Sequence, residues 1–327
     1  MANLTFTVAC GPYDRTEALR TGEVKPEGID LNYIPIQSPP EIFSRMIDFK
    51  SFDGSEMSLS QYLQMRANGN DEFTGLPIFP SRVFRQGFIF VRDNIKNPKD
   101  LEGKTVGVPE YWQTAAVWIR GLLQHEYDVD LHSINWIEGG VDVPLSYEEI
   151  EARKTMAGYR PAMLPYGKCL SEELRNGGID AAIGARKPAS VDSTKEVDRL
   201  FPNYREIERQ YFEKTGIFPI MHTFVIRTEI FERYPWVTES LYKAFTEAKR
   251  IAIRKMHFTG TIKYTLPWLF NDLEEIDTIF NGDPWPYGFS ANKHVLEAFS
   301  SYLLEQNFIK KPFDVSQFFT PILDSTQ

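Results

Sequence analysis

The chain has 327 residues, of which 42% are hydrophobic and 25% are charged. These values are typical of a globular protein with a sizeable core, and the length predicts two domains. The 36 basic and 45 acidic residues give a net charge of -9, which argues against non-specific nucleic-acid binding because such binding needs a basic face. The apolar runs are shorter than the roughly 20 residues of a membrane span, so no membrane partner is expected.

The N-terminal sequence and the cysteines predict a cytoplasmic protein. No basic region, apolar region or small-residue cleavage site follows Met1, so no export is expected if Met1 is the native start. The two cysteines, Cys10 and Cys169, lie far apart in the sequence. We therefore expect no disulfide framework, and the two cysteines fit a reducing compartment.

Strands and helices alternate along the first part of the chain. The residue pattern predicts strands at Leu4–Ala9, Ile29–Ile36 and Phe88–Val91, and a helix over Pro40–Asp48. A turn-rich segment follows the first strand, and Asp53–Glu56 is predicted to be a loop. Ser58 and Gln61 have the spacing of a capping box, which predicts the start of a helix at that point.

A second unit begins near Pro98. A helix is predicted from Thr114, because the apolar positions 115, 118, 119 and 122 fall on one face. The glycines Gly177 and Gly178 suit the end of a short helix. Further strands are predicted at Trp136–Gly140, Ile179–Ala185 and Phe218–Ile226, a turn and strand at Leu101–Pro109, and helices at Leu170–Arg175 and Trp236–Met256.

This alternation predicts an α/β fold with two doubly wound sheet domains and a central cleft. Ligands of such folds bind beyond the carboxyl ends of the strands. That rule selects Gly11–Arg15, Asp53–Glu56, Glu110–Gln113, Gly139-Gly140, Arg186 and His222.

The layout resembles the type 2 periplasmic-binding-protein fold, in which one domain is inserted into the other. This resemblance implies a first, discontinuous domain of residues 1–98 and 221–327 and an inserted second domain of residues 99–220. Longer stretches resemble the 4,5-dihydroxyphthalate decarboxylase family: FPSRVFRQGFIFVR (79–92), GVPEYWQTAAVWIRGLLQHEY (107–127), GGIDAAIGARKP (177–188), KTGIFPIMHTFVIR (214–227) and YPWVTESLYKAFTEAK (234–249).

The family resemblance implies a carboxy-lyase that converts a hydroxylated aromatic diacid to protocatechuate without oxidation. Each carboxylate of 4,5-dihydroxyphthalate is para to a hydroxyl, so the substrate supplies the electrons for ring protonation. No cofactor is therefore expected. The partner is a small aromatic carboxylate, and we also expect a homo-oligomer.

Arginines are the candidates for binding the substrate carboxylates, because a guanidinium can pair with a carboxylate through two hydrogen bonds. The candidates are Arg82, Arg85, Arg186 and Arg15. In an extended strand, the spacing of Arg82 and Arg85 places them on opposite faces, whereas a turn lets both reach one site. The alternative is that some or all of them are surface arginines.

His222 is the candidate for acid–base catalysis, since imidazole titrates near neutral pH. The alternative is a core histidine that hydrogen-bonds the backbone. Glu110 and Glu56 are the carboxylate candidates, although Glu56 could merely complement a helix dipole. The other histidines are predicted to be solvated (His125, His132) or structural (His257, His294).

Aromatic side chains that could stack on the substrate ring are Tyr13, Tyr111 and Trp112, and each of them could equally belong to the core. Ser55, Gln113 and Thr114 could offer neutral hydrogen bonds. Asp53 with Glu56 could pair around a metal, but no histidine or carboxylate cluster supports this, so no metal is expected. Cys10 is predicted to be a small buried thiol.

Two competing functions remain open from the sequence. The first is a solute-binding protein for an aromatic or carboxylic ligand without chemistry, against which the missing export signal argues. The second is another enzyme on the same fold, such as a pyrimidine-forming or chorismate-processing relative, whose own signatures are not seen.

Overall fold

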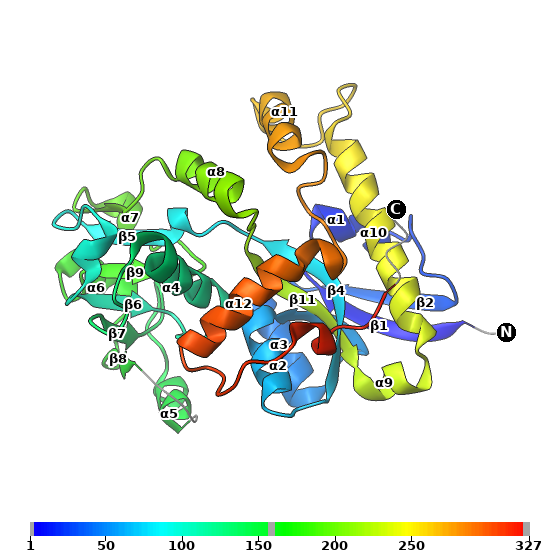
Figure 1. Ribbon diagram of the computed structural model, residues 1–327, viewed down its shortest axis with the longest axis horizontal. Coiled ribbons are helices and arrows are strands. Elements are labelled where there is room, and N and C mark those ends of the chain that lie inside the picture. Colours follow the sequence, from blue (N-terminus) through cyan, green and yellow to red (C-terminus); the bar gives the residue numbers. More distant parts are fainter. Residues whose placement is uncertain (1–2, 156–160, 323–327) are drawn as a thin grey trace. The chain divides into compact units, whose positions relative to one another are not determined.

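The computed structural model describes residues 3–155 and 161–322, which form two β-sheets with their helices (Figure 1). The chain divides into two compact units. Unit 1 comprises Met1–Arg82, Ile220–Glu297 and Phe313–Gln327, and unit 2 comprises Val83–Pro219 and Ala298–Pro312. The α/β fold class predicted from the sequence is confirmed.

Unit 1 contains a five-stranded sheet of order β2-β1-β3-β11-β4. Its strands are β1 (Leu4–Cys10), β2 (Ile29–Pro35), β3 (Gly54–Ser58), β4 (Phe73–Arg82) and β11 (Ile220–Arg227). The strand β1 runs parallel to β2 and β3, whereas β11 runs antiparallel to β3 and β4. The sheet is therefore mixed, and the chain returns to it through one reversed strand.

Helices of this part of the chain are α1 (Asp14–Arg20), α2 (Pro39–Phe49), α3 (Leu59–Ala67), α9 (Thr228–Arg233), α10 (Trp236–Met256), α11 (Leu269–Phe280) and α12 (Lys293–Glu305). The helix α12 begins in unit 1 and ends in unit 2. In unit 1, α1 packs against the long helix α10, drawn in yellow in Figure 1. The predicted amphipathic pattern of α10 is confirmed, because Leu241, Ala244, Phe245 and Ala248 are all buried.

The prediction of a loop at Asp53–Glu56 is wrong, because most of this segment belongs to the strand β3. Every residue of β3 is buried, and this strand lies in the middle of the sheet, with β1 on one side and β11 on the other. Its sequence, GSEMS, lacks apolar alternation because polar side chains occupy buried positions. The predicted cap after it is present: the hydroxyl of Ser58 accepts the backbone N–H of Gln61 at 3.4 Å.

The pairing of β11 with the edge strand β4 is irregular around His222. The paired positions are Ile220 with Arg82, His222 with Ser81, and Phe224 with Leu76. From His222 to Phe224 the chain advances two residues, while β4 advances five, so residues 77–80 form a bulge. Pro77 and Pro80 lie in this bulge, where a missing N–H removes no ladder hydrogen bond.

Unit 2 contains a six-stranded sheet of order β10-β5-β9-β6-β7-β8. Its strands are β5 (Ile89–Arg92), β6 (Thr105–Val108), β7 (Asn135–Glu138), β8 (Ala162–Met163), β9 (Ala181–Ile183) and β10 (Val197–Arg199). Its helices include α4 (Thr114–Tyr127), α5 (Tyr147–Thr155), α6 (Leu170–Asn176), α7 (Ser190–Ser193) and α8 (Tyr204–Thr215). The strand β5, which the sequence analysis assigned to the first domain, pairs with β9 and β10 of this sheet.

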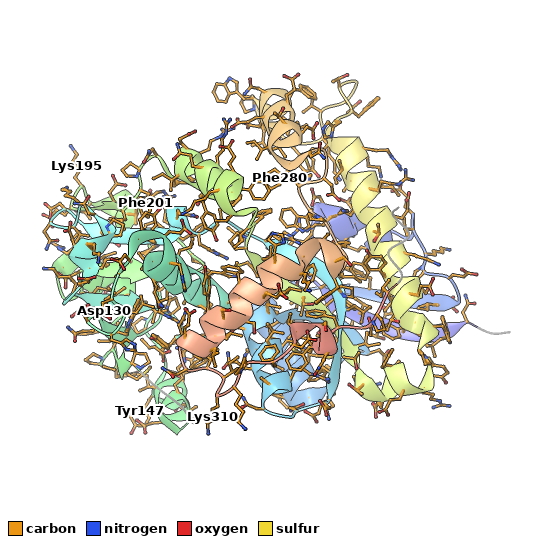
Figure 2. All side chains as sticks on the ribbon, in the orientation of Figure 1. Asp130, Tyr147, Lys195, Phe201, Phe280 and Lys310 are labelled. Atoms are coloured by element: carbon orange, nitrogen blue, oxygen red, sulfur yellow. The ribbon has the colours of Figure 1, made fainter. Side chains whose placement is uncertain are left out.

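The core of unit 2 forms between this sheet and α4. Trp118, Ile119 and Leu122 of α4 are fully buried, as its predicted apolar face requires. Phe201, labelled in Figure 2, is 8% exposed and stacks on Tyr127 with ring centres 5.1 Å apart. The predicted stop of α6 is also present, since Gly177 takes a left-handed conformation with φ +80°.

Helices long and apolar enough for a membrane crossing are absent from residues 3–155 and 161–322.

Candidate active site

The carboxylate of Glu56 is the centre of a buried polar cluster in unit 1. The parallel pairing of β1 with β3 places the end of β1, at Cys10, beside Glu56. Glu56 is 0% exposed. Its Oε1 accepts the N–H of Gly11 at 3.3 Å and the hydroxyl of Tyr13 at 3.4 Å, and its Oε2 accepts the thiol of Cys10 at 3.6 Å. A buried carboxylate needs such donors, because desolvation penalises its charge.

His222 joins this cluster from β11. It pairs with Ser58 of β3, and Glu56 lies two residues before Ser58 on the same face of that strand. Nδ1 of His222 lies 3.7 Å from Oε2 of Glu56 and has no hydrogen-bond partner among the described residues. The imidazole also contacts the ring of Phe43, edge to face, with ring centres 5.0 Å apart. The two groups form an ion pair when the imidazole is protonated.

The thiol and the phenols around Glu56 are held in their protonated forms. Burial, followed by the nearby Glu56 carboxylate, raises the pKa of the Cys10 thiol well above its ordinary value. Burial likewise raises the pKa of the Tyr13 hydroxyl, and Glu56 adds to the effect. Both groups therefore act as hydrogen-bond donors to Glu56. The prediction of a buried thiol at Cys10 is confirmed, and its protonated state opposes a role as a thiolate nucleophile.

Arg15 lies next to this cluster and is held between two aromatic rings. Its guanidinium carbon is 4.1 Å from the centre of the Tyr13 ring and 4.2 Å from that of Trp285. Nε donates to the carbonyl of Pro80 at 2.6 Å, and Nη1 lies 3.2 Å from Asp14. Among the described residues, Nη2 of Arg15 has no hydrogen-bond partner. The arrangement fixes a planar cation that keeps one edge for an anion.

Arg82 is buried rather than exposed on the surface. It is 3% exposed, and burial lowers the pKa of its guanidinium to about 9. Nη2 donates to the carbonyl of Pro286 at 2.9 Å and to the side chain of Asn292. Arg82 is thus hydrogen-bonded to the segment that precedes α12.

Arg85 lies in unit 2 and is also buried, at 4% exposure. Burial lowers the pKa of its guanidinium to about 9, and Glu208 opposes that shift. The guanidinium carbon lies 4.9 Å from the centre of the Phe88 ring. Glu208 accepts the N–H of Gly87 at 2.9 Å, and burial raises the pKa of its carboxyl to about 6.

The other candidates of unit 2 gather around Glu110. Burial raises the pKa of the Glu110 carboxyl, and the nearby charges of Arg153 and then Arg186 oppose this shift. Nη2 of Arg153 lies 3.4 Å from Oε1 of Glu110. Arg153 also lies 5.8 Å from the ring centre of Trp112. Arg186 is exposed.

Tyr111 belongs to the core of unit 2. It is 6% exposed, and its ring contacts Trp136 edge to face with centres 5.7 Å apart. The guanidinium carbon of Arg120 lies 3.8 Å from the centre of the Tyr111 ring. This environment is that of the core alternative that the sequence left open for Tyr111.

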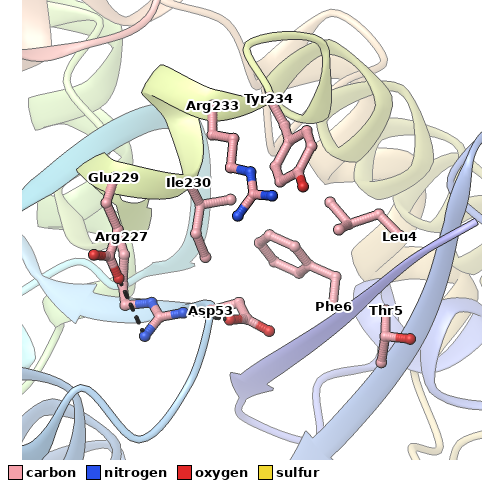
Figure 3. A pocket seen from close by; sticks show the side chains of 9 residues that line it. All are labelled: Leu4, Thr5, Phe6, Asp53, Arg227, Glu229, Ile230, Arg233 and Tyr234. Carbon is pink, nitrogen blue, oxygen red and sulfur yellow. Dashed lines mark hydrogen bonds and ion pairs between the residues drawn. The ribbon is translucent and has the colours of Figure 1, made fainter.

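Asp53 is engaged by protein groups at the edge of a separate pocket, shown in Figure 3. Its Oδ1 lies 2.8 Å from Nη2 of Arg227, and its Oδ2 accepts the N–H of Thr7 at 2.8 Å. The pocket has a volume of about 450 Å³ and lies at the start of β1, whereas Cys10 ends that strand. In the described part of the chain, no three His, Cys, Asp or Glu side chains are grouped so that they could hold a metal ion.

The contacts of His125 and His257 are with residues outside the Glu56 cluster. His125 lies 2.6 Å from Glu305 and stacks on Tyr302, and His257 lies 2.9 Å from Asp277. The hydrogen bond to the carbonyl of Ile253, followed by Asp277, raises the pKa of His257. His132 and His294 are exposed.

Sequence reasoning missed Trp285, which forms one side of the Arg15 site. It lies in an irregular segment after α11, with no periodic pattern that would mark it. Tyr33 was also missed: its hydroxyl donates to the carbonyl of Gly11 at 2.9 Å and lies 2.9 Å from the Thr16 hydroxyl. Its position near the carboxyl end of β2 was the available signal.

Two curated proteins are similar to this chain over much of its length. The 4,5-dihydroxyphthalate decarboxylase of Comamonas testosteroni is 37% identical over 302 residues, which cover 91% of this chain and 91% of that protein. The 4,5-dihydroxyphthalate decarboxylase of Pseudomonas putida is 36% identical over 191 residues, covering 58% of this chain and 73% of that protein. No family model matches the chain.

Solved structures share the fold. The periplasmic aliphatic sulphonate binding protein SsuA from Escherichia coli aligns with a TM-score of 0.55 at 12% identity, covering 97% of this chain and 98% of that one. Similarity at this level concerns the fold and not the chemistry. The predicted type 2 periplasmic-binding-protein-like fold is therefore confirmed.

Proposed function

The chain belongs to the 4,5-dihydroxyphthalate decarboxylase family, and from this membership we propose that it converts 4,5-dihydroxyphthalate to protocatechuate and carbon dioxide. The structural observation that supports the proposal is the group in unit 1: a fixed cation, Arg15, beside a buried carboxylate and an imidazole, Glu56 and His222. These groups match the needs of an aromatic diacid that must be held by one carboxylate and protonated on its ring.

The reaction replaces a carboxylate by a proton. A proton adds to the ring carbon that bears the leaving carboxylate, while the para hydroxyl gives up its proton and becomes a carbonyl. The carbon–carbon bond then breaks, carbon dioxide leaves, and the electron pair restores the aromatic ring and the phenolate, which regains its proton. No electrons are gained or lost overall, so the step needs one proton donor, one proton acceptor and charge stabilisation.

Arg15 binds the carboxylate that is retained. Its Nη2 edge has no partner among the described residues, and the rings of Tyr13 and Trp285 restrict its rotation. A guanidinium fixed in this way loses little side-chain entropy when it pairs with a carboxylate. A charged hydrogen-bonded pair of this kind contributes roughly 1.5–3 kcal/mol.

His222 exchanges the protons, and Glu56 supports it. Nδ1 of the imidazole lies 3.7 Å from Oε2 of Glu56 and has no hydrogen-bond partner among the described residues, so the carboxylate lies directly beside the ring. The Gly11, Tyr13 and Cys10 donors hydrogen-bond the Glu56 carboxylate and hold it in place beside the imidazole. Substrate contacts of Arg85, Glu110, Trp112 and Arg186 stay predictions.

The protein is proposed to act in the cytoplasm as a homo-oligomer. The cysteines Cys10 and Cys169 are both free, which fits a reducing compartment and supports the location. Apolar side chains exposed between α10 and α11 support the assembly: Phe258 is 61% exposed and Trp268 is 74% exposed. Light scattering of the wild type and of Trp268→Ser tests the assembly. An equal molar mass for the two proteins would remove this support.

Product chromatography tests the reaction. The purified, metal-free protein is incubated with 4,5-dihydroxyphthalate and with a panel of hydroxylated benzoates and phthalates between pH 5 and pH 9. Formation of protocatechuate without oxygen or nicotinamide is expected. Tight binding with no product at any pH would favour the alternative, a solute-binding protein for an aromatic or carboxylic ligand.

A further inference from the structure

The segment 283–292, between α11 and α12, is fastened to β4 at several points. The N–H of Gly288 donates to the carbonyl of Pro77 at 2.8 Å, and Nε1 of Trp285 donates to the carbonyl of Phe79 at 2.9 Å. Both acceptors lie in the bulge of β4. Because the bulge interrupts the ladder with β11, its carbonyls are available to this segment. We call the segment 283–292 the strap.

The ends of the strap are held by two buried cations. Nζ of Lys249, on α10, lies 2.6 Å from Asp283 and donates to the carbonyl of Trp285 at 2.9 Å. Arg82 donates to the carbonyl of Pro286 and to the side chain of Asn292. Asn292 in turn donates to the carbonyls of Pro286 and Gly288, at 3.0 and 2.7 Å. The side chain of Lys249 is 7% exposed and Arg82 is 3% exposed, so both cations are buried, whereas the side chain of Asp283 is 48% exposed.

The strap and the bulge meet at Arg15. The next carbonyl of the bulge, that of Pro80, accepts Nε of Arg15 at 2.6 Å. The Trp285 ring covers one face of the same guanidinium, 4.2 Å from its carbon. One irregular stretch of β4 thus anchors both the cation and the ring that covers it.

We propose that the strap sets the position of Arg15 for carboxylate binding, which makes Trp285 a positioning residue and makes Lys249 and Arg82 its supports. The inference rests on the proposed role of Arg15. It assigns to Arg82 a task different from direct carboxylate binding. Loss of the Trp285 ring frees the guanidinium to rotate, so the substrate must then fix it, and affinity falls while the proton transfer at His222 stays as it was.

The experiment compares steady-state kinetics of Trp285→Leu, Arg15→Ala and the double variant. Trp285→Leu is expected to raise KM about tenfold with kcat within threefold of the wild type. In the Arg15→Ala background it is expected to change kcat/KM by less than twofold, because its effect passes through Arg15. Trp236→Leu, a half-exposed tryptophan on α10, is the matched control and should leave both constants unchanged.

A second variant covers the case in which Trp285→Leu does not fold. Lys249→Met removes a support that comes from α10 and leaves Asp283, whose side chain is 48% exposed, in contact with water. It is expected to raise KM about threefold with kcat unchanged.

Separate outcomes identify which idea fails. If the effects of Trp285→Leu and Arg15→Ala are fully additive, or if KM is unchanged in both Trp285→Leu and Lys249→Met, the proposed role of the strap is wrong. The proposed role of Arg15 is not affected by either result. A normal KM in Arg15→Ala would overturn the role of Arg15 and the strap with it. If no product forms in the wild type, calorimetric binding of phthalate to the same variants gives the same comparison without relying on decarboxylation.

Discussion

Nδ1 of His222 lies 3.7 Å from Oε2 of Glu56, across two neighbouring strands of the unit 1 sheet. The carboxylate is fully buried, and the imidazole has a side-chain exposure of 16%. A fully enclosed acid beside a more accessible base is an arrangement in which only the base meets the substrate. This relationship supports the proposal that His222 exchanges protons and that Glu56 supports it.

His222→Gln is expected to lower kcat by roughly 100- to 10,000-fold, because glutamine can hydrogen-bond but cannot transfer a proton. Steady-state turnover of 4,5-dihydroxyphthalate measures the effect. His132→Gln, at an exposed position, is the control and should keep wild-type turnover. Retention of more than about a third of the turnover by His222→Gln, far above that range, would exclude His222 and make Glu110 the leading candidate.

Arg15→Lys is expected to raise KM about tenfold, because lysine keeps the charge but loses the planar fork. Arg15→Ala should reduce kcat/KM by roughly 10- to 150-fold, the equivalent of a lost charged hydrogen bond. Arg20→Ala, on the same helix α1 and paired with Glu17 at the surface, serves as the control. Equal KM values for the wild type and Arg15→Ala would place carboxylate binding on another arginine, with Arg85 as the next to test.

Gly11→Ala is expected to lower kcat/KM about tenfold. A Cβ at this position would lie 2.7 Å from two atoms of the Tyr13 ring, so the ring must move. Its movement removes the hydroxyl from Glu56 and one covering ring from Arg15. In a Tyr13→Ala background the same substitution should have little further effect. A tenfold loss that persists in that background would trace the damage to the backbone and not to the tyrosine.

Glu208→Gln is expected to stabilise the protein at pH 7.5 and to have no effect at pH 4. Burial raises the pKa of the Glu208 carboxyl to about 6, above the roughly 4.3 of an unfolded chain. Between these values the folded state binds more protons, so the stability contributed by this group is full below about pH 4.3 and is lost as the pH rises through about 6. The gain is about 1 kcal/mol after allowance for partial solvent screening.

Urea unfolding at both pH values measures this difference. Glu206→Gln, at an exposed position on the same helix α8, is the control and should change neither curve. An equal gain at pH 4 and pH 7.5 would show that the effect does not arise from the charge of Glu208.

Periodic elements were predicted well from the sequence, and buried polar ones were not. The helix α10 and the strands β1 and β2 carry clear apolar patterns, which the packing uses directly. The strand β3 reads as a loop because Ser55, Glu56 and Ser58 occupy positions that are normally apolar. Glu56 forms the centre of the candidate cluster and Ser58 caps α3, so the pattern fails where polar side chains are buried.

The residues of the candidate site could be predicted in part, and for a physical reason. Glu56, His222, Tyr13 and Arg15 follow from the rule that ligands bind near strand ends, and the structure brings these four into one contact network. Trp285 reaches Arg15 only through tertiary packing of an irregular segment, which leaves no local signal. The strand β4 was not recognised because Pro77 and Pro80 argue against a strand.

The two prolines of the β4 bulge also affect how the chain finds its fold. A regular ladder between β4 and β11 would require an N–H donor at one of the two positions, Pro77 or Pro80, because residues three apart in a strand point their backbone groups to opposite sides. A competing register without the bulge is therefore penalised before any side chain packs. The prolines therefore favour the alignment in which the carbonyls of Pro77, Phe79 and Pro80 accept hydrogen bonds from Gly288, Trp285 and Arg15, outside the sheet.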